Sequence, residues 1–586
     1  MEICQTLFYK RLFDILKNIS NASFVTIDLE MSGIPTRSRF SPGSRSQNAT
    51  KPTLQQQYDD VRSAAETFQI LQVGLTLVEE VREKDFYIAR PYNFDLSPLS
   101  YRGNDIGLQR TFSFSSSACD FLQKNSFDIG KVFRTGVPYL SREEESRLRK
   151  EDDQRAENKS KIPDLIIKND DTNALKFCQD VRSSITDWLK KARPDLLKDC
   201  KLTGFQRRLV YQIVRKEFPD LRAFGRSDGD FMQIEKLDLK NEANFQTERL
   251  RRFNSKIIRQ IGFRWVFEAL CGGDVSEIDP LWFYDMEDDE SEKQPNAIAS
   301  RIKELNAKLL MKDHIIVGHN LFMDLAFLYK TFVGPLPSYV EEFKNEIHRL
   351  FPKIIDTKFM ATHGLETMFT RSSLKEVLKP LQVINNPLIL LHQDHREYGS
   401  SFGKDHEAGY DSWMTAELFI KLSAKIHSEQ NELKDIEENT GFSHDENKSS
   451  QEISDNHYHK EEDSSTAPIS SDQSFQKDVY PTKNFNSSFV STNPFAVLEN
   501  IDPEQSPEDT SKLNITARCD HRWLPDFTDD FWLAYFNKIR VNSIEGGTCD
   551  MATSDSDDGD TSDTARPDSN EGEHSPAKKK LCIKNK

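Results

Sequence analysis

The chain has 586 residues and a formal net charge of −17 at pH 7, and its negative charge is concentrated towards the end. Residues 431–586 contain 32 acidic and 16 basic side chains, whereas residues 1–430 are close to electroneutral. The eight cysteines are scattered without a Cys-x-x-Cys pair, which argues against a zinc site and against a disulfide framework. No apolar run is long enough to span a membrane, and Lys10, Arg11 and Asp14 interrupt any signal-peptide pattern, so we expect a soluble intracellular protein.

The first hundred residues predict one helix and three strands. Residues 3–19 have the apolar spacing of an amphipathic helix. Residues 24–27, 67–78 and 86–92 are rich in β-branched and aromatic side chains, which favours strands. The charged stretch between the last two strands is typical of a turn, so the predicted sheet begins with antiparallel strands.

The middle of the chain predicts a helix over 118–133, a charged connector over 141–171 and a basic segment over 178–225. Within that segment, residues 181–225 contain 11 basic and 5 acidic side chains. Such a local surplus indicates a module that faces phosphates, and the alternative is a basic surface exposed only to water.

Helices and short strands alternate from residue 242 to residue 427, which predicts an α/β domain. Helices are expected over 242–270, 297–312, 320–332, 339–349, 372–380 and 407–427, and short strands over 314–318 and 354–356. After residue 431 the composition is typical of disorder, except for the apolar island 531–541. That island predicts either a short folded element or a docking segment.

Four carboxylates occur at positions that favour one common site. Asp28 and Glu30 alternate on the first strand and therefore project from the same face. Asp324 lies in an apolar helical run, where a carboxylate needs a partner, and Asn320 is expected one turn before it on the same helix. Asp411 begins another amphipathic helix, preceded by His406. Taken singly, each has a plainer explanation: a strand end in solvent, a solvated helix residue, or a cap.

Taken together, these residues predict a metal site. Four clustered carboxylates require cations, and hard oxygen ligands select Mg²⁺ or Mn²⁺. Two such ions would bracket a scissile phosphate, and a histidine with an ordinary pKa is suited to accept the proton of the attacking water.

This order of motifs resembles the DEDDh 3′–5′ exonucleases of RNase H-like fold, and among them the poly(A)-specific ribonuclease family. The similar stretches are Asp28-x-Glu30-x-Ser32-Gly33-Ile34, Phe127 to Leu140, Val317 to Asp324, Ile355 to Lys358 and His406 to Asp411. The resemblance implies that Asp28, Glu30, Asp324 and Asp411 bind two Mg²⁺ ions, with Mn²⁺ as a substitute, and that His406 is the general base. It also implies RNA contacts by Ile34, Phe121, Asn320 and Lys358.

The resemblance implies a nuclease domain with a mixed central sheet, formed by residues 1–165 and 245–430, and interrupted by a small α+β nucleic-acid-binding insert at 172–240. The insert resembles an arginine–histidine domain in which Tyr211 replaces the histidine, and it implies phosphate contacts by Arg207 and Arg208. Residues 431–586 are expected to be a largely disordered tail with a folded island near 515–548. We expect that removing this tail leaves a folded, active core.

The implied function is metal-dependent 3′–5′ degradation of poly(A) tails with release of 5′-nucleotides. One alternative is 3′-end trimming of small or non-coding RNAs by the same chemistry, and another is a catalytically inactive RNA-binding scaffold. The expected partner is an RNA 3′ end, a homodimer is implied by the resemblance alone, and no membrane is expected. Location in the nucleus, the cytoplasm or both is expected, and Lys578, Lys579 and Lys580 resemble a nuclear-import patch.

Overall fold

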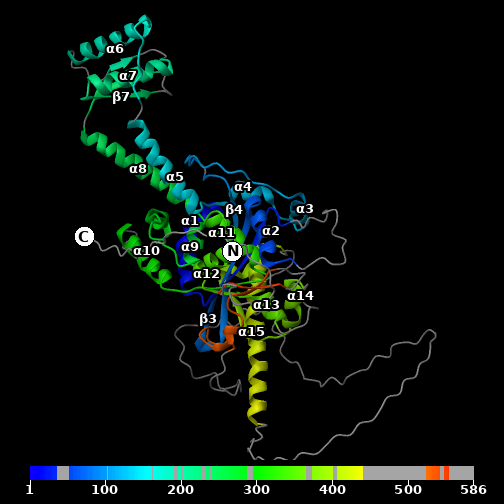
Figure 1. Cartoon of the computed structure of the whole chain (residues 1–586). Coiled ribbons are helices and arrows are strands. Elements are labelled where there is room, and N and C mark those ends of the chain that lie inside the picture. Colours follow the sequence, from blue (N-terminus) through cyan, green and yellow to red (C-terminus); the bar gives the residue numbers. More distant parts are fainter. Residues whose placement is uncertain are drawn as a thin grey trace, which may run out of the picture. The chain divides into compact units, whose positions relative to one another are not determined.

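The computed structural model describes residues 1–35, 52–101, 103–160, 163–190, 196–198, 202–226, 231–237, 239–286, 295–363, 372–399, 406–439, 523–541 and 547–552 (Figure 1). Within the described part of the chain, the residues up to 430 and those from 523 to 552 form one compact unit, here called the first unit. The first unit is mixed α/β, as the sequence predicts. No helix in the described part of the chain is both long enough and apolar enough to cross a membrane.

An eight-stranded mixed sheet forms the centre of the first unit, in the order β1-β4-β3-β2-β9-β10, with β5 and β11 paired to β4. The pairs β2–β3 and β3–β4 are antiparallel, which confirms the predicted start, while β9 runs parallel to both β2 and β10. The strands are β1 (Glu2–Ile3), β2 (Phe24–Met31), β3 (Ile70–Val81), β4 (Phe86–Ser97), β5 (Val137–Pro138), β9 (Ile315–Gly318), β10 (Lys353–Asp356) and β11 (Leu388–Leu391).

Two hydrophobic clusters cover the two faces of this sheet. One contains the apolar faces of α1, α2, α9, α10, α11 and α12, and the other contains those of α13, α14 and α15. Outside the insert, the helices are α1 (Gln5–Asn21), α2 (Leu54–Thr67), α3 (Ser116–Lys124), α4 (Ile129–Thr135), α5 (Arg142–Ser160), α8 (Leu239–Ile261), α9 (Arg264–Leu270), α10 (Pro295–Leu310), α11 (Phe322–Phe332), α12 (Val340–Leu350), α13 (Thr357–Thr362), α14 (Leu374–Leu378) and α15 (Ala408–Asn439).

Two helices that the sequence predicts as continuous are each broken. The expected helix over 118–133 is divided into α3 and α4, with Ser126 at a φ of 63° between them. The expected helix over 242–270 is divided into α8 and α9 at Gly262, whose φ is 51°. A Cβ atom at Gly262 would lie 1.9 Å from the carbonyl oxygen of Pro138, so only glycine fits this close approach.

The insert has its own small core. A three-stranded sheet in the order β6-β8-β7 packs with two helices around residues such as Val181, Ile185 and Leu209. A capping box between Thr203 and Gln206 begins the second helix. The elements are α6 (Thr172–Lys190), β6 (Leu196–Lys198), α7 (Gly204–Glu217), β7 (Leu221–Arg226) and β8 (Phe231–Lys236).

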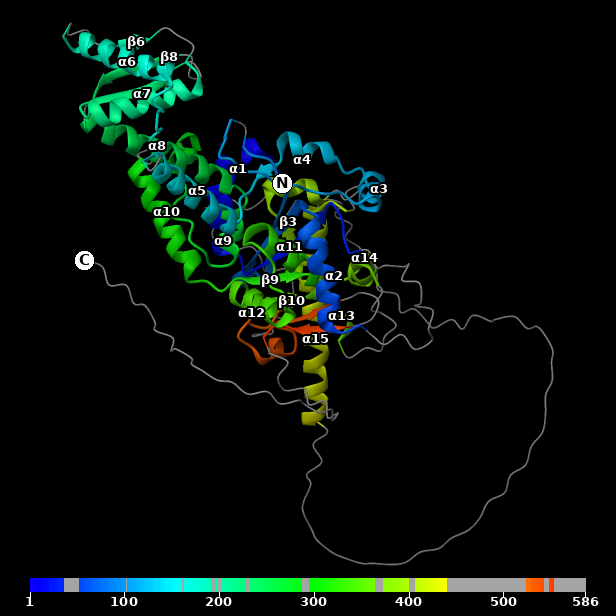
Figure 2. The ribbon, with the colours of Figure 1, turned by 45° about the horizontal axis from the view of Figure 1, so that its top comes forward.

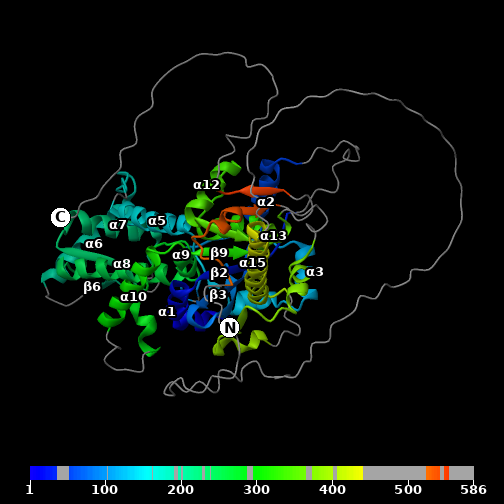
Figure 3. The same cartoon turned by 90° about the horizontal axis from the view of Figure 1, so that it is seen from below.

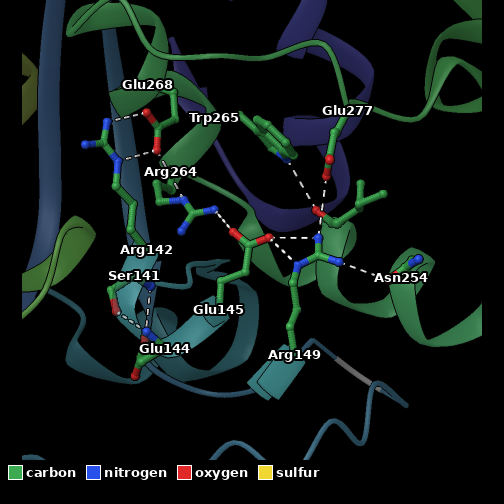
Figure 4. Close-up of polar contacts among 11 residues, drawn as sticks. Ser141, Arg142, Glu144, Glu145, Arg149, Asn254, Arg264, Trp265, Glu268 and Glu277 are labelled. Carbon is green, nitrogen blue, oxygen red and sulfur yellow. Dashed lines mark hydrogen bonds and ion pairs between the residues drawn. The ribbon is translucent and has the colours of Figure 1, made fainter. Parts of the chain in front are cut away.

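The charged connector expected over 141–171 is largely a helix, α5. Its charges pair within the helix and with residues around it, which explains why a segment of such low hydropathy is ordered (Figure 4). Arg142 forms a two-pronged ion pair with Glu268, with contacts of 2.9 and 2.5 Å. Arg149 pairs with Glu145 and donates to Asn254 Oδ1 at 2.9 Å, which joins α5 to α8. These ion pairs and hydrogen bonds hold α5 against its neighbours, in a segment whose sequence has few apolar side chains to pack.

A folded segment near the C-terminus packs against the rest of the first unit, and the expectation that a chain without residues 431–586 keeps a folded, active core stays a prediction. The segment comprises a short 3₁₀ helix, η7 (Asp530–Ala534), and the antiparallel strands β12 (Lys538–Arg540) and β13 (Thr548–Asp550). Trp532 is fully buried in the cluster around α15, while Ile539 and Met551 belong to the cluster on the other face. Figure 2 shows the segment, in orange and red, beside β10 and α13.

Candidate active site

The alternation of β2 separates its apolar side chains from its acidic ones. Val25, Ile27 and Leu29 point into the cluster around α1, so Asp28 and Glu30 project from the opposite face. Thr26 lies on that same face and donates from Oγ1 to the carbonyl oxygen of Ser412 at 2.7 Å. The two carboxylates of β2 therefore face the start of α15, which Figure 3 shows beside β2, β3 and β9.

Polar side chains of β3 and β4 fix the start of α15. The backbone N–H of Ala408 donates to Gln72 Oε1 at 2.9 Å, and that of Gly409 donates to Asn93 Oδ1 at 3.0 Å. Gln72 is held in turn by Asp95, which accepts from its Nε2 at 2.9 Å. These buried amides satisfy N–H groups that the first turn of a helix leaves free. They set the position from which Asp411 projects, although no local pattern in the sequence marks Gln72 or Asn93.

Gly74 allows α15 to approach the sheet closely. It is paired with Asp28 in the β2–β3 ladder. A Cβ atom at Gly74 would lie 1.8 Å from the carbonyl oxygen of Ala408, so any other residue would push the helix start away. A glycine inside an otherwise apolar strand is the signal in the sequence that could have revealed this contact.

Asp324 comes from the first turn of α11, and the turn before it differs from the prediction. Asn320 does not lie on the helix with Asp324: it precedes α11 with a φ of 65°. Its backbone N–H donates to Asp356 Oδ1 at 2.8 Å, and this bond stabilises the left-handed turn. The prediction that Asn320 and Asp324 share a helical face is therefore wrong, because Asn320 belongs to the loop between β9 and α11.

The electrostatics of the four predicted carboxylates show that they lie close together. Burial, followed by the charges of Asp411, Asp324 and Glu30, raises the pKa of Asp28 well above its usual value. Burial and the charges of Asp411 and Asp324 raise the pKa of Glu30 to about 8. Burial also raises the pKa of Asp324 to about 8, with a smaller contribution from Asp356. This mutual repulsion is what a divalent cation bound by carboxylate oxygens would relieve.

His406 and Asp411 complete the cluster. One ligand atom each from Glu30, His406 and Asp411 lies within 4.8 Å of the others, a spacing that suits a metal ion. His406 is exposed, has a φ of 63°, and meets the ring of Phe121 edge-to-face at 4.7 Å between centroids. The structure thus gathers Asp28, Glu30, Asp324, Asp411, His406 and Phe121 around one point.

The other residues predicted to contact RNA differ in their accessibility. Ile34, just after β2, is 52% exposed, whereas Lys358 is only 5% exposed and its backbone N–H binds Asp356. On α7 of the insert, Arg207 is half-buried, and Arg208 is exposed but donates to the carbonyl oxygen of Pro163 at 2.8 Å. The side chain of Lys358 therefore offers little surface to a ligand in this conformation.

The raised pKa values predict how stability depends on pH. A carboxyl whose pKa is higher in the folded than in the unfolded state favours folding when protonated, so stability falls as the pH rises from about 4 towards about 8. Between about pH 5 and about pH 8 in EDTA, we expect the Tm to fall by at least about 4 °C, which corresponds to about 4 kcal/mol for a unit of this size at about 2 cal/mol/K per residue.

Thermal unfolding with and without Mg²⁺ checks this prediction. Mg²⁺ should remove most of the fall, because bound cations neutralise the carboxylates. In Asp28→Asn the fall should be smaller, since one repelling charge is absent. An equal pH dependence in EDTA and in Mg²⁺ would contradict the metal assignment.

Comparison with known proteins identifies the family. Residues 3–419 match the model of the family described as CAF1 family ribonuclease. The chain belongs to the CAF1 ribonuclease family. The matched range includes the four carboxylates and the histidine, which are Asp28, Glu30, Asp324, His406 and Asp411.

Two curated relatives of the family are similar over most of this chain. Human "Poly(A)-specific ribonuclease PARN" is 27% identical over 447 residues, which are 73% of this chain but 62% of that protein. The "Pre-piRNA 3'-exonuclease trimmer" of Bombyx mori is 26% identical over 434 residues, which are 72% of this chain and 71% of that protein. The chain thus matches less than two thirds of the length of the human relative.

A solved structure of S. pombe Pop2p, in a Mg²⁺ and Mn²⁺ bound form, is 14% identical, covering 71% of this chain and 89% of that chain. Its TM-score of 0.31 is too low to transfer any feature of that site to this one.

Proposed function

We propose that this protein is a metal-dependent 3′–5′ exoribonuclease that removes poly(A) from RNA and releases 5′-nucleotides. The observation that carries the proposal is the convergence of Asp28, Glu30, Asp324 and Asp411 beside His406. The likeness to the human poly(A)-specific ribonuclease supports poly(A) as the substrate.

The donor set fits hard divalent cations. The carboxylates are oxygen ligands whose pKa values are raised by burial and by one another's charge, and Mg²⁺ and Mn²⁺ prefer such ligands. When bound, a pair of these ions would supply activation of water and neutralisation of the leaving 3′ oxygen. We infer that Asp28, Glu30, Asp324 and Asp411 would hold them.

The remaining residues have roles in binding and in proton transfer. His406 stands at the exposed side of the cluster, where its imidazole can accept a proton from an attacking water. The half-exposed ring of Phe121 contacts that imidazole and can restrict its orientation. Ile34 and Phe121 offer apolar surface to the terminal bases of the RNA, and stacking of this kind is tolerant of sequence.

A second candidate is the trimming of small-RNA 3′ ends by the same chemistry. The similarity to the Bombyx mori trimmer supports this candidate. The alignment covers 71% of the trimmer but 62% of the human protein. The two functions differ in substrate rather than in catalytic residues.

Product analysis on matched RNAs tests the proposal. RNAs of equal length, labelled at the 5′ end and ending in oligo(A) or in mixed sequence, are incubated with Mg²⁺ or EDTA. We expect stepwise shortening in Mg²⁺ only, release of 5′-mononucleotides, and inhibition by a 3′-phosphate. Preference for oligo(A) supports deadenylation, and equal rates support trimming.

Asp411→Asn is the matched inactive control. If the parent protein cleaves neither RNA with Mg²⁺ or Mn²⁺ but still binds RNA, the proposal is wrong and the scaffold alternative stands.

A further inference from the structure

The described residues 523–541 and 547–552, here called the C-terminal strap, pack beside β2, the strand that carries Asp28 and Glu30. Trp532 has no exposed surface. Its ring lies 5.6 Å from that of Phe419 on α15 and 4.9 Å from that of Phe527. Phe527 in turn meets Phe24, at the start of β2, at 6.3 Å between ring centroids. The strap therefore packs against β2, which carries Asp28 and Glu30, and against α15, which carries Asp411.

A second anchor covers the edge of the central sheet at β10. The backbone N–H of Asn537 donates to the carbonyl oxygen of Ile354 at 2.7 Å, and its Oδ1 accepts from the N–H of Ile354 at 3.2 Å. Its Nδ2 also donates to the carbonyl oxygen of Pro352 at 3.0 Å. Asn537 adopts a φ of 63°, which asparagine tolerates better than most residues. The side chain of Asn537 thus forms hydrogen bonds with backbone groups at β10, the last strand in the order of the central sheet.

The third contact reaches the loop beside the acidic cluster through Asp356. This carboxylate is fully buried, and each of its two oxygens accepts from backbone N–H groups. Oδ2 accepts from the backbone N–H of Arg540 at 2.9 Å. Oδ1 accepts from the backbone N–H groups of Asn320 at 2.8 Å and Lys358 at 2.9 Å. A buried carboxylate with both oxygens bonded is held in one orientation, so the strap and the Asn320 turn share a rigid link.

The side chain of Arg540 fixes the strap to the end of α13. Nε donates to Thr362 Oγ1 at 2.9 Å, and Nη2 donates to the carbonyl oxygen of Thr362 at 3.2 Å. Only 9% of Arg540 is exposed, and its guanidinium lies 5.6 Å from the ring of Phe359. The guanidinium thus binds α13, the helix that begins directly after Asp356. This contact holds the backbone N–H of Arg540 within hydrogen-bond distance of the Asp356 carboxylate.

We propose that the C-terminal strap completes the RNA side of the site, with Arg540 and Asp356 as positioning residues that hold the Asn320 turn. This inference rests on the proposed function, because it assigns the turn to substrate binding. It predicts a specific kinetic pattern. Loss of the link should weaken RNA binding and leave the chemical step nearly intact. Asp28, Glu30 and Asp411 are positioned by β2 and α15, and Asp324 is held by the apolar side chains of α11, which pack in the hydrophobic cluster around α1 and not against Asp356.

Variants of the full-length protein test the link. Asp356→Asn keeps an acceptor for Asn320 and Lys358 but replaces the oxygen that receives the N–H of Arg540. Arg540→Ala removes the grip on Thr362. For both we expect KM for oligo(A) RNA to rise about tenfold, equivalent to about 1.4 kcal/mol, with kcat within about twofold of the parent. Arg540→Lys, which keeps one donor, should be less impaired, and Leu533→Ala, an exposed strap residue, should match the parent.

The inference is overturned if Asp356→Asn and Arg540→Ala keep the parent's KM, or if kcat falls as much as KM rises, which would indicate a structural role only. RNA affinity measured in EDTA separates this outcome from failure of the proposed function. If the parent binds but does not cleave RNA, the same variants should still weaken that binding, and unchanged binding would overturn the inference.

A protease site inserted into residues 440–522 tests whether the strap is held without the chain connection. After cleavage, we expect the fragment to coelute with the nuclease and the KM to stay unchanged. With Trp532→Ala, the cleaved fragment should separate and the KM should rise. Loss of the fragment from the cleaved parent would contradict the proposal.

Discussion

Replacing Asp28 with asparagine is expected to lower kcat for RNA cleavage by at least about a thousandfold, the effect of losing about 4 kcal/mol of transition-state stabilisation from a metal ligand. Burial raises the pKa of Asp28, and the charges of Asp411, Asp324 and Glu30 raise it further. Steady-state cleavage of a labelled oligo(A) RNA in saturating Mg²⁺ measures the change.

The same substitution should stabilise the metal-free protein. Because it removes a buried charge that three carboxylates repel, we expect a higher Tm than the parent in EDTA at about pH 8. Asp14→Asn, a surface exchange on α1 where Asp14 pairs with Arg11, should change neither quantity. An Asp28→Asn protein that cleaves as fast as the parent would show that Asp28 binds no catalytic metal.

The second large effect is expected from Gly74→Ala. The added methyl group would overlap the carbonyl of Ala408, so α15 must move away from β3. Such a shift displaces Asp411 and His406 relative to Asp28 and Glu30, and a misplacement of about 1 Å can reduce kcat about a hundredfold. We also expect a loss of about 1–3 kcal/mol of stability from overpacking. Rate measurements and urea unfolding of the same preparation record both effects.

Gly204→Ala is the matched control for this experiment. A Cβ at Gly204, at the start of α7, meets no atom within 4 Å, so activity and stability should stay close to those of the parent. If Gly74→Ala retains full activity, the close approach of α15 is not what positions Asp411.

The sequence predicts those parts of the site that depend on local periodicity. Alternation along β2 is enough to place Asp28 and Glu30 on one face, and the amphipathic pattern after Asp411 directs that residue inward. Gln72 and Asn93 could not be assigned in this way, because their function depends on how two other strands meet the N-terminus of α15. Hydrogen bonds between elements that are distant in the sequence produce no periodic pattern of residue types from which they could be predicted.

The turn at Asn320 and the pairing of charges in the basic segment could not be predicted from the sequence, for different physical reasons. Asn320 fits a helical pattern by spacing, but the bond from its N–H to Asp356 stabilises a left-handed turn instead. In the basic segment, Arg215 and Lys216 count toward the surplus of positive charge over 181–225, and both pair with Asp164. A count of charges cannot show which of them are already neutralised by a distant partner.

The division of the nuclease unit along the chain has a consequence for its synthesis. The ribosome delivers α1 and β2 first, whereas Asn537 and Arg540, which close the edge at β10, emerge only after residues 440–522 have been added. Until then, β10 presents unpaired backbone groups, and such edges promote association between chains. A chain that ends before residue 537 should therefore be prone to aggregation and depend on chaperones, even though it contains every predicted metal ligand.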